Sequence, residues 1–197
     1  MGTETLTLVG GHPALDLVNT AERGVPAAGA PPRDHLATPE DVVVWARRVG
    51  LDPGTPDEAG LRRLRGLREA VHAAVLDRLG RPVGDVTQAL ELLDRRAAAA
   101  AARSRLRPAG AGLLREVGTD PTHRVEDQLA VAAVDLLTGP DAGRIKRCPV
   151  ERGGCGWVFV DRSRNSSRTW CRMADCGTAV KVRRLTERRR QARAAER

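Results

Sequence analysis

Residues 148–177 read CPVERGGCGWVFVDRSRNSSRTWCRMADCG, and this stretch holds all four cysteines of the 197-residue chain. They are Cys148, Cys155, Cys171 and Cys176, in the pattern C-x6-C-x15-C-x4-C. Four thiolates this close together are what a tetrahedral structural zinc site needs, and a closed shell of four sulfurs leaves no coordination position for catalysis. Gly153 and Gly154 would let the longer first gap turn back. We therefore predict one structural Zn²⁺ ion per chain.

Two other interpretations of the cysteines stay open at this point. A pair of disulfides would require an oxidising compartment, yet the chain begins MGTETLTLVGG, without the basic start and apolar run of a secretory signal. Four unrelated buried thiols would have no reason to cluster. The sequence also contains no apolar stretch long enough for a membrane span. We therefore expect a soluble cytoplasmic protein.

Aromatic residues are scarce, and three of the four lie between Cys155 and Cys171. These three are Trp157, Phe159 and Trp170, whereas Trp45 is far away and the chain has no tyrosine. A small metal-centred module has little core of its own, so it concentrates large side chains around the metal. We expect the three aromatic rings to form the core of the finger. Stacking on exposed bases is the alternative role.

Charge is distributed as unevenly as cysteine. Residues 144–197 contain 16 basic and 5 acidic residues, a net of +11, whereas residues 1–143 contain 17 basic and 20 acidic residues, a net of −3. A basic end of this kind is typical of polyanion-binding proteins. The alternative is a solubilising, arginine-rich tail in a chain that uses 31 Arg and 2 Lys.

The front of the chain carries repeated helix signals. The apolar stripe from Leu61 to Leu79 predicts one long helix that ends at Gly80. A break at residues 108–112 could join two short strands. N-cap residues, followed in three cases by proline, predict helix starts at Thr38-Pro39-Glu40-Asp41, Thr55-Pro56-Asp57-Glu58, Asp85 and Asp120-Pro121.

Gly139-Pro-Asp-Ala-Gly143 separates this helical part from the cysteine-rich part. Residues 156–161 favour a strand, residues 162–168 a polar turn, and residues 178–197 a helix. We expect a hairpin to carry the chain from the first cysteine pair to the second. The prediction is a mainly α fold: a helical domain over residues 1–140, expected to fold alone, and a treble-clef-like zinc finger with a basic C-terminal helix over residues 144–197.

Basic residues of the predicted finger are candidates for nucleic-acid contacts, because arginine makes planar, multi-donor contacts to phosphates and to guanine edges. Lys181, Arg184 and Arg188 fall on one helical face, which suits a phosphate backbone. A solvated helix with no specific partner is the alternative. The candidate set is Arg162, Arg164, Arg168, Arg172, Lys181, Arg183, Arg184 and Arg188.

Asp16 and Asn19, near the start of the chain, are candidates for a small-molecule pocket in the helical domain. The sequence contains no P-loop, no Rossmann glycine fingerprint and no His-Glu-x-x-His motif. Because the predicted metal site is also coordinatively closed, we do not expect an enzyme.

Two family resemblances cover nearly the whole chain in order. Residues 157–165 (WVFVDRSRN) and 168–177 (RTWCRMADCG) resemble the CGNR zinc finger, and Trp-Cys-x4-Cys-Gly is the most specific part. Residues 14–20 (ALDLVNT), 38–45 (TPEDVVVW) and 67–71 (LREAV) resemble the ABATE domain that usually precedes this finger.

The resemblance implies a bacterial transcription regulator, described as stress-induced, with a finger that binds zinc through the four cysteines and also binds DNA. One departure matters: the name-giving Cys-Gly-Asn-Arg reads Cys176-Gly177-Thr178-Ala179 here. Zinc binding should not suffer, but any DNA contact of that arginine is missing.

Two functions are therefore compared below. The first is a DNA-binding regulator whose front domain senses a small-molecule ligand or dimerises. The second is a protein-interaction or RNA-associated module with a structural finger and a tail that binds polyanions without sequence preference. The oligomeric state, a homodimer included, is left open by the sequence.

Overall fold

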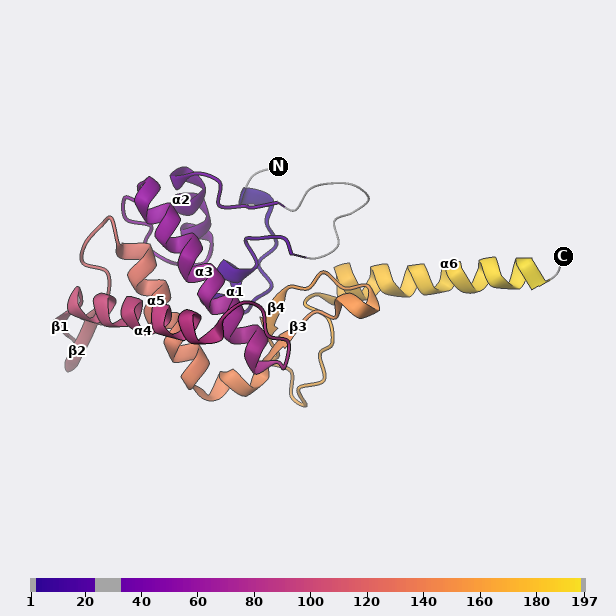
Figure 1. The fold of residues 1–197 in the computed structure, drawn as a ribbon. Coiled ribbons are helices and arrows are strands. Elements are labelled where there is room, and N and C mark those ends of the chain that lie inside the picture. Colours follow the sequence, from indigo (N-terminus) through magenta and orange to yellow (C-terminus); the bar gives the residue numbers. More distant parts are fainter. Residues whose placement is uncertain (1–2, 24–32, 196–197) are drawn as a thin grey trace.

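The computed structural model describes residues 3–23 and 33–195, apart from the side chains of residues 184, 189 and 192–195. A helical body is followed by the cysteine-rich part and by one long helix that projects from it (Figure 1). The helices are α1 Pro13–Val18, α2 Pro39–Arg48, α3 Glu58–Arg78, α4 Val86–Ala102, α5 Arg124–Thr138 and α6 Thr178–Ala195. The strands are β1 Arg105–Ala109, β2 Gly112–Glu116, β3 Ile145–Arg147 and β4 Val158–Val160. The mainly α prediction is confirmed.

Helix starts follow the predicted caps in two cases and differ in two. Thr38 and Asp41 form a reciprocal capping box at α2, and the Asp85 carboxylate accepts hydrogen bonds from the first turn of α4. The predicted N-cap at Thr55 is wrong, because the Thr55 N–H donates to the Pro121 carbonyl at 2.9 Å and Asp57 caps α3 instead. The predicted start at Asp120 is also wrong, since its carboxylate closes a turn with Thr122 before α5 begins.

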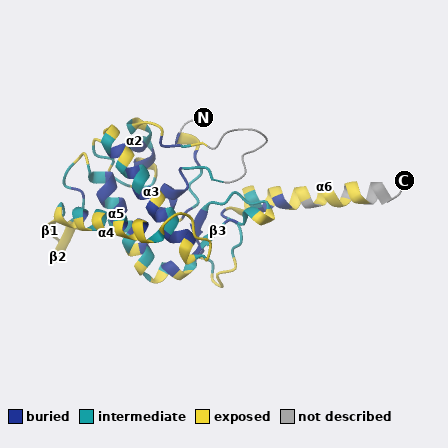
Figure 2. Cartoon of the chain, viewed as in Figure 1, coloured by how far each residue is buried: buried dark blue, intermediate teal, exposed yellow. Residues whose placement is uncertain are grey.

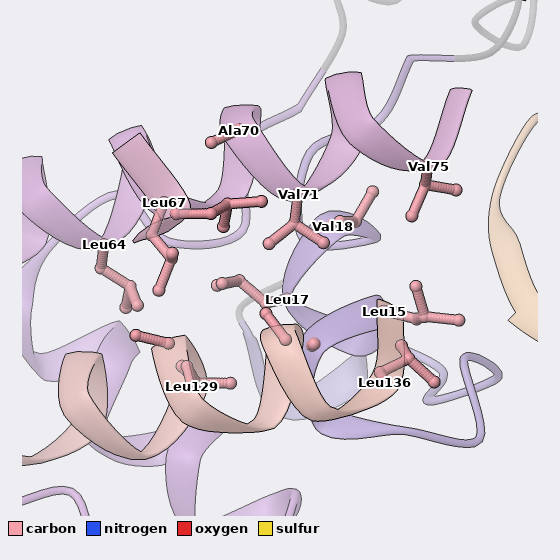
Figure 3. Close-up of a cluster of buried hydrophobic side chains, with 14 of the residues drawn as sticks. Leu15, Leu17, Val18, Leu64, Leu67, Ala70, Val71, Val75, Leu129 and Leu136 are labelled. Carbon is pink, nitrogen blue, oxygen red and sulfur yellow. The ribbon is translucent and has the colours of Figure 1, made fainter. Parts of the chain in front are cut away.

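The core lies where α1, α3 and α5 meet. Leucine and valine side chains of these three helices point toward one another in Figure 3, among them Leu17, Leu67 and Leu129, which are fully buried. Figure 2 shows the same concentration of buried positions in the body, whereas α6 is exposed over most of its described length. A six-residue helix in the middle of a core is held by this packing rather than by its own propensity.

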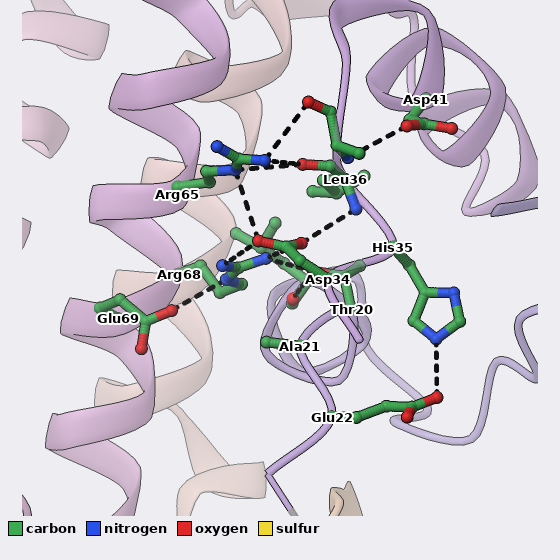
Figure 4. A network of polar contacts seen from close by, with 12 residues as sticks. Thr20, Ala21, Glu22, Asp34, His35, Leu36, Asp41, Arg65, Arg68 and Glu69 are labelled. Carbon is green, nitrogen blue, oxygen red and sulfur yellow. Dashed lines mark hydrogen bonds and ion pairs between the residues drawn. The ribbon is translucent and has the colours of Figure 1, made fainter. Parts of the chain in front are cut away.

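A charge network centred on the buried Arg68 fastens the segment before α2 to α3 (Figure 4). Arg68 of α3, whose side chain is 6% exposed, donates both terminal nitrogens to the Asp34 carboxylate at 2.7 and 2.9 Å. Arg65 donates to the Leu36 carbonyl at 2.7 Å. Burial alone would raise the pKa of Asp34, but the hydrogen bonds from Arg68 and from the Leu36 N–H bring it below its ordinary value.

The core continues from the helical body into the cysteine-rich part. Ile145 of β3 and Val158 and Val160 of β4 belong to the same buried cluster as the helix side chains. Asn19, just after α1, pairs with the backbone of Val158 in both directions: its Nδ2 donates to the carbonyl and its Oδ1 accepts from the N–H, each at 2.9 Å. Independent folding of residues 1–140 stays a prediction, and such a fragment would expose this part of the core.

None of the helices in the described residues combines the length and apolar character needed to cross a bilayer.

Replacing Asn19 with alanine should lower the free energy of unfolding by about 2–4 kcal/mol, because two buried backbone groups of Val158 would lose their partners. Urea denaturation measures this loss as a lower midpoint, with no change in the slope of the unfolding free energy against urea concentration. Asn165→Ala, in an exposed turn, is the control and should change stability by less than about 0.5 kcal/mol. Equal effects of the two substitutions would contradict the proposed contribution of Asn19, which joins the helical body to β4.

Candidate metal centre

The first cysteine pair lies in the connection of a hairpin. Strands β3 and β4 pair antiparallel, with Ile145 opposite Val160 and Arg147 opposite Val158. The Cys148 N–H donates to the Trp157 carbonyl at 2.8 Å and closes the loop that carries Cys155. The predicted hairpin between the two cysteine pairs is thus corrected, because the first pair lies inside the hairpin. Its first strand, β3, precedes Cys148 and has no apolar pattern, since Ile145 is the one apolar residue among its three.

Glycine is required where this loop turns back. Gly153 has a φ of 87°, in the left-handed region. A Cβ at Gly154 would lie 2.6 Å from the Cys148 sulfur and 2.9 Å from the Pro149 carbonyl oxygen. Only a residue without a side chain lets the backbone pass so close to the sulfur of Cys148.

The second cysteine pair leads directly into α6. Cys171 ends the loop after β4, and Cys176 lies in a short wide turn, Met173–Gly177, that continues as α6. The Thr178 hydroxyl donates to the Met173 carbonyl at 3.1 Å and ties the turn to the helix. Hairpin, second cysteine pair and helix are thus arranged in the treble-clef-like order.

The four sulfurs fit one zinc ion. The Sγ atoms of Cys148, Cys155, Cys171 and Cys176 all lie within 4.8 Å of one another. The Cys155 and Cys171 sulfurs are 3.4 Å apart and those of Cys171 and Cys176 are 3.7 Å apart. A tetrahedral ion with Zn–S bonds of 2.3 Å separates its sulfurs by about 3.8 Å. All four cysteines are free thiols, so the disulfide interpretation is not supported.

The cluster needs a cation to hold four thiolates. Hydrogen bonding with Cys148 raises the pKa of Cys155 to about 12 and also raises that of Cys171, since the proton they share is held between sulfurs. A zinc ion removes this obstacle because it replaces the protons, and its binding energy then becomes folding energy.

Aromatic side chains enclose the sulfurs, as predicted. Phe159 is fully buried and packs with Cys148 and Cys171, and Trp157 and Trp170 cover the same cluster. The Arg168 guanidinium lies over the Phe159 ring, 4.4 Å from its centre, and donates to the carbonyls of Trp170 and Cys171. Arg168, a predicted nucleic-acid residue, is therefore engaged in the structure of the finger itself.

Asp161 organises the turn between β4 and the second pair. Its fully buried carboxylate accepts from Lys146 Nζ at 2.6 Å, from Ser163 and from the Arg168 N–H at 2.9 Å. Burial by itself would raise its pKa, but these hydrogen bonds lower it below the ordinary range. Sequence reasoning missed Lys146, whose strand has no local signal.

The remaining predicted basic residues lie at the surface of the finger and α6. Arg162 forms an ion pair with Asp141 at 3.3 Å, and Arg172 forms one with Asp175 at 3.5 Å. The Arg184 side chain lies outside those that the structure describes. The predicted basic residues whose side chains are exposed to solvent include Arg164, Lys181, Arg183 and Arg188.

Asp16 and Asn19 both make hydrogen bonds within the fold, and their role in a small-molecule pocket stays a prediction. Asp16 is buried and accepts from the Gly10 N–H at 2.8 Å, while Asn19 binds β4 as described above. A cavity of about 760 Å³ lies elsewhere in the helical body, between α3 and α4, with His72 and Arg95 in its wall. Burial lowers the pKa of His72 to about 4, so the imidazole is neutral near pH 7.

Comparison with known families supports both parts of the chain. The family model ABATE, described as "Putative stress-induced transcription regulator", matches residues 11–140. The chain belongs to the ABATE family. A second model, the CGNR zinc finger, matches residues 144–189 and includes all four cysteines, so the metal is one structural zinc ion. No curated protein matches the sequence significantly.

Purified protein should contain one zinc ion per chain, with four sulfurs at about 2.3 Å in X-ray absorption. Cys176→Ser should weaken metal binding and lower the stability of the whole chain, since β4 shares the core of the body. Arg172→Ala, an exposed neighbour between two ligands, should retain the metal. Oxygen or nitrogen ligands in the first shell, or a native finger without metal, would disprove this assignment.

Proposed function

We propose that this protein is a DNA-binding transcription regulator in which zinc orders a basic finger that contacts duplex DNA. The observation that carries the proposal is the charge of the finger and α6. Residues 178–195 contain seven basic residues and one acidic residue, on a helix that projects from the metal site. Like charges so close together repel one another in the free helix, and a phosphate backbone would relieve that repulsion.

The front domain supplies the regulatory part of this proposal. The cavity between α3 and α4 falls in the size range of small-molecule sites and supports a sensing role, although dimerisation through the same domain remains the alternative. The closed shell of four sulfurs supports a structural metal and a protein without enzymatic activity. A regulator of this kind would act in the cytoplasm, where bacterial DNA lies.

A specific observation favours the second function, a protein-interaction or RNA-associated module whose tail binds polyanions without sequence preference. Thr178 and Ala179 occupy the places of the Asn and Arg that give the CGNR finger its name, so one candidate DNA contact is missing. A groove of about 360 Å³ beside α6 also has apolar residues in its wall, of which Met173 and Leu185 are 63% and 50% exposed. An apolar surface of this kind is typical of protein contacts.

The salt dependence of DNA binding tests the proposal. About five phosphate contacts would give a slope near −4 to −5 for log K against log salt. The double variant Lys181→Ala/Arg188→Ala should lower affinity for all sequences alike and flatten the slope by up to about two units. The control Arg107→Ala, an exposed arginine of β1, should change neither quantity.

A parallel titration with single-stranded RNA separates the two functions. Tighter binding to RNA than to any duplex, or no duplex binding at about 50 mM salt where phosphate contacts are strongest, would favour the second function. Thr178→Asn/Ala179→Arg should strengthen duplex binding if the family arginine contacts DNA. Fluorescence anisotropy with labelled oligonucleotides measures all of these affinities.

A further inference from the structure

A second basic surface includes cations that are not among the predicted nucleic-acid residues. A cavity of about 380 Å³ opens where the end of α3 meets residues 148–155, the loop that carries the first cysteine pair and is called the metal loop below. Its wall includes Arg81, just after α3, and five charged residues of the finger part, so that five cations face one carboxylate. The finger residues are Lys146, Arg147, Glu151, Arg152 and Arg168.

Arg147 is the cation in this wall that lacks a partner. It lies in β3 and is half-buried. Within the described residues, no hydrogen bond, ion pair or ring contact is made by its guanidinium, in contrast to Lys146 and Arg168, which are held by Asp161 and by backbone carbonyls. The Glu151 carboxylate attracts Arg147 through space but forms its ion pair with Arg81, so Arg147 keeps the capacity to bind an anion from outside.

Arg152 connects this cavity to the surface already described. Its guanidinium lies over the Trp170 ring, 5.3 Å from the centre, which restricts its orientation and leaves its N–H groups free for an anion. Arg152 also lines the groove beside α6, together with Lys181 and Arg188. The basic surface therefore runs from α6, across the metal loop, to the end of α3.

Glu151 is the single carboxylate in the wall of the cavity, and it forms an ion pair with Arg81. Its Oε1 accepts from Arg81 at 2.8 Å, and the two side chains are about half exposed. An exposed ion pair of this kind contributes little to stability. A phosphate can therefore displace the Glu151 carboxylate from Arg81 at small cost.

We propose that this cavity, the junction site, binds a backbone phosphate of nucleic acid through Arg81, Arg147 and Arg152. It would thereby extend the DNA-binding surface from the finger onto the helical body. The inference rests on the proposed function and adds Arg81, which lies outside the finger. The bound strand would displace Glu151 from Arg81, which makes Glu151 a residue that weakens binding.

The test measures duplex affinity and salt slope for single variants of the full chain with zinc bound. Arg81→Ala and Arg147→Gln should each lower affinity by up to about eightfold at 0.1 M salt and flatten the slope by about one unit, the counterion-release value of one phosphate. Glu151→Gln should raise affinity by up to about the same factor, because it releases Arg81. Circular dichroism and zinc content confirm that each variant is folded.

The matched controls come from the β1–β2 hairpin. Arg107 and Glu116 form an ion pair of 3.1 Å with similar exposure, at the far end of the body from the finger (Figure 1). Arg107→Ala and Glu116→Gln change the net charge by the same amounts and should leave binding unchanged, since charges beyond a Debye length of about 10 Å at 0.1 M salt are screened.

The outcomes separate the two proposals. If Lys181→Ala/Arg188→Ala weakens binding while the Arg81, Arg147 and Glu151 variants match wild type, the finger binds DNA and the junction site is overturned. If Glu116→Gln raises affinity as much as Glu151→Gln, the effect is one of net charge and the junction site is again overturned. If the wild-type chain binds no duplex, the proposed function itself fails, and the junction site fails with it.

Discussion

The pairing of Asn19 with Val158 is the interaction on which the arrangement of this protein depends. Strand β4 has three residues and pairs with β3 along one edge only. Its other edge is completed by the Asn19 amide and by the Gly10 carbonyl, which accepts from the Val160 N–H at 2.9 Å. A two-stranded ladder this short is unstable alone, so the helical body supplies the missing partner. The hairpin that carries the first cysteine pair is thereby fixed to the start of the chain.

The charged side chains of this protein fall into two groups, those paired with protein groups and those without a partner. Two buried charges are held by protein groups: Arg68 binds Asp34, and Asp161 binds Lys146 and two backbone N–H groups. Near the loop that carries Cys148 and Cys155, Lys146 and Arg168 are held by protein groups, whereas no hydrogen bond or ion pair within the described residues holds Arg147. The positive charges that no protein group pairs with gather near this loop, which supports the proposed contact with a polyanion.

The zinc site gives α6 an ordered first turn. An isolated helix of about this length is marginal in water, and its row of arginines makes it less stable. The second cysteine pair fixes the first turn through Cys176 and the Thr178–Met173 hydrogen bond, so the helix begins from an ordered end. Metal binding, which the sequence indicates directly, thus also sets the direction in which the basic helix leaves the body.

The sequence by itself determined the four metal ligands, the aromatic cover of the sulfurs, the caps of α2 and α4 and the bias of positive charge toward one end. Each of these depends on residues close together in the chain, where spacing and local hydrogen bonding are sufficient. Tertiary structure decided the partner of β4, the true starts of α3 and α5, the internal use of Arg168 and the meeting of Arg81 with the metal loop. Asn19 illustrates the reason: its pattern marks only a polar residue after a short helix, and its role arises from a backbone strand 139 residues away. Such contacts are selected by the packing of the whole core, which no local pattern records.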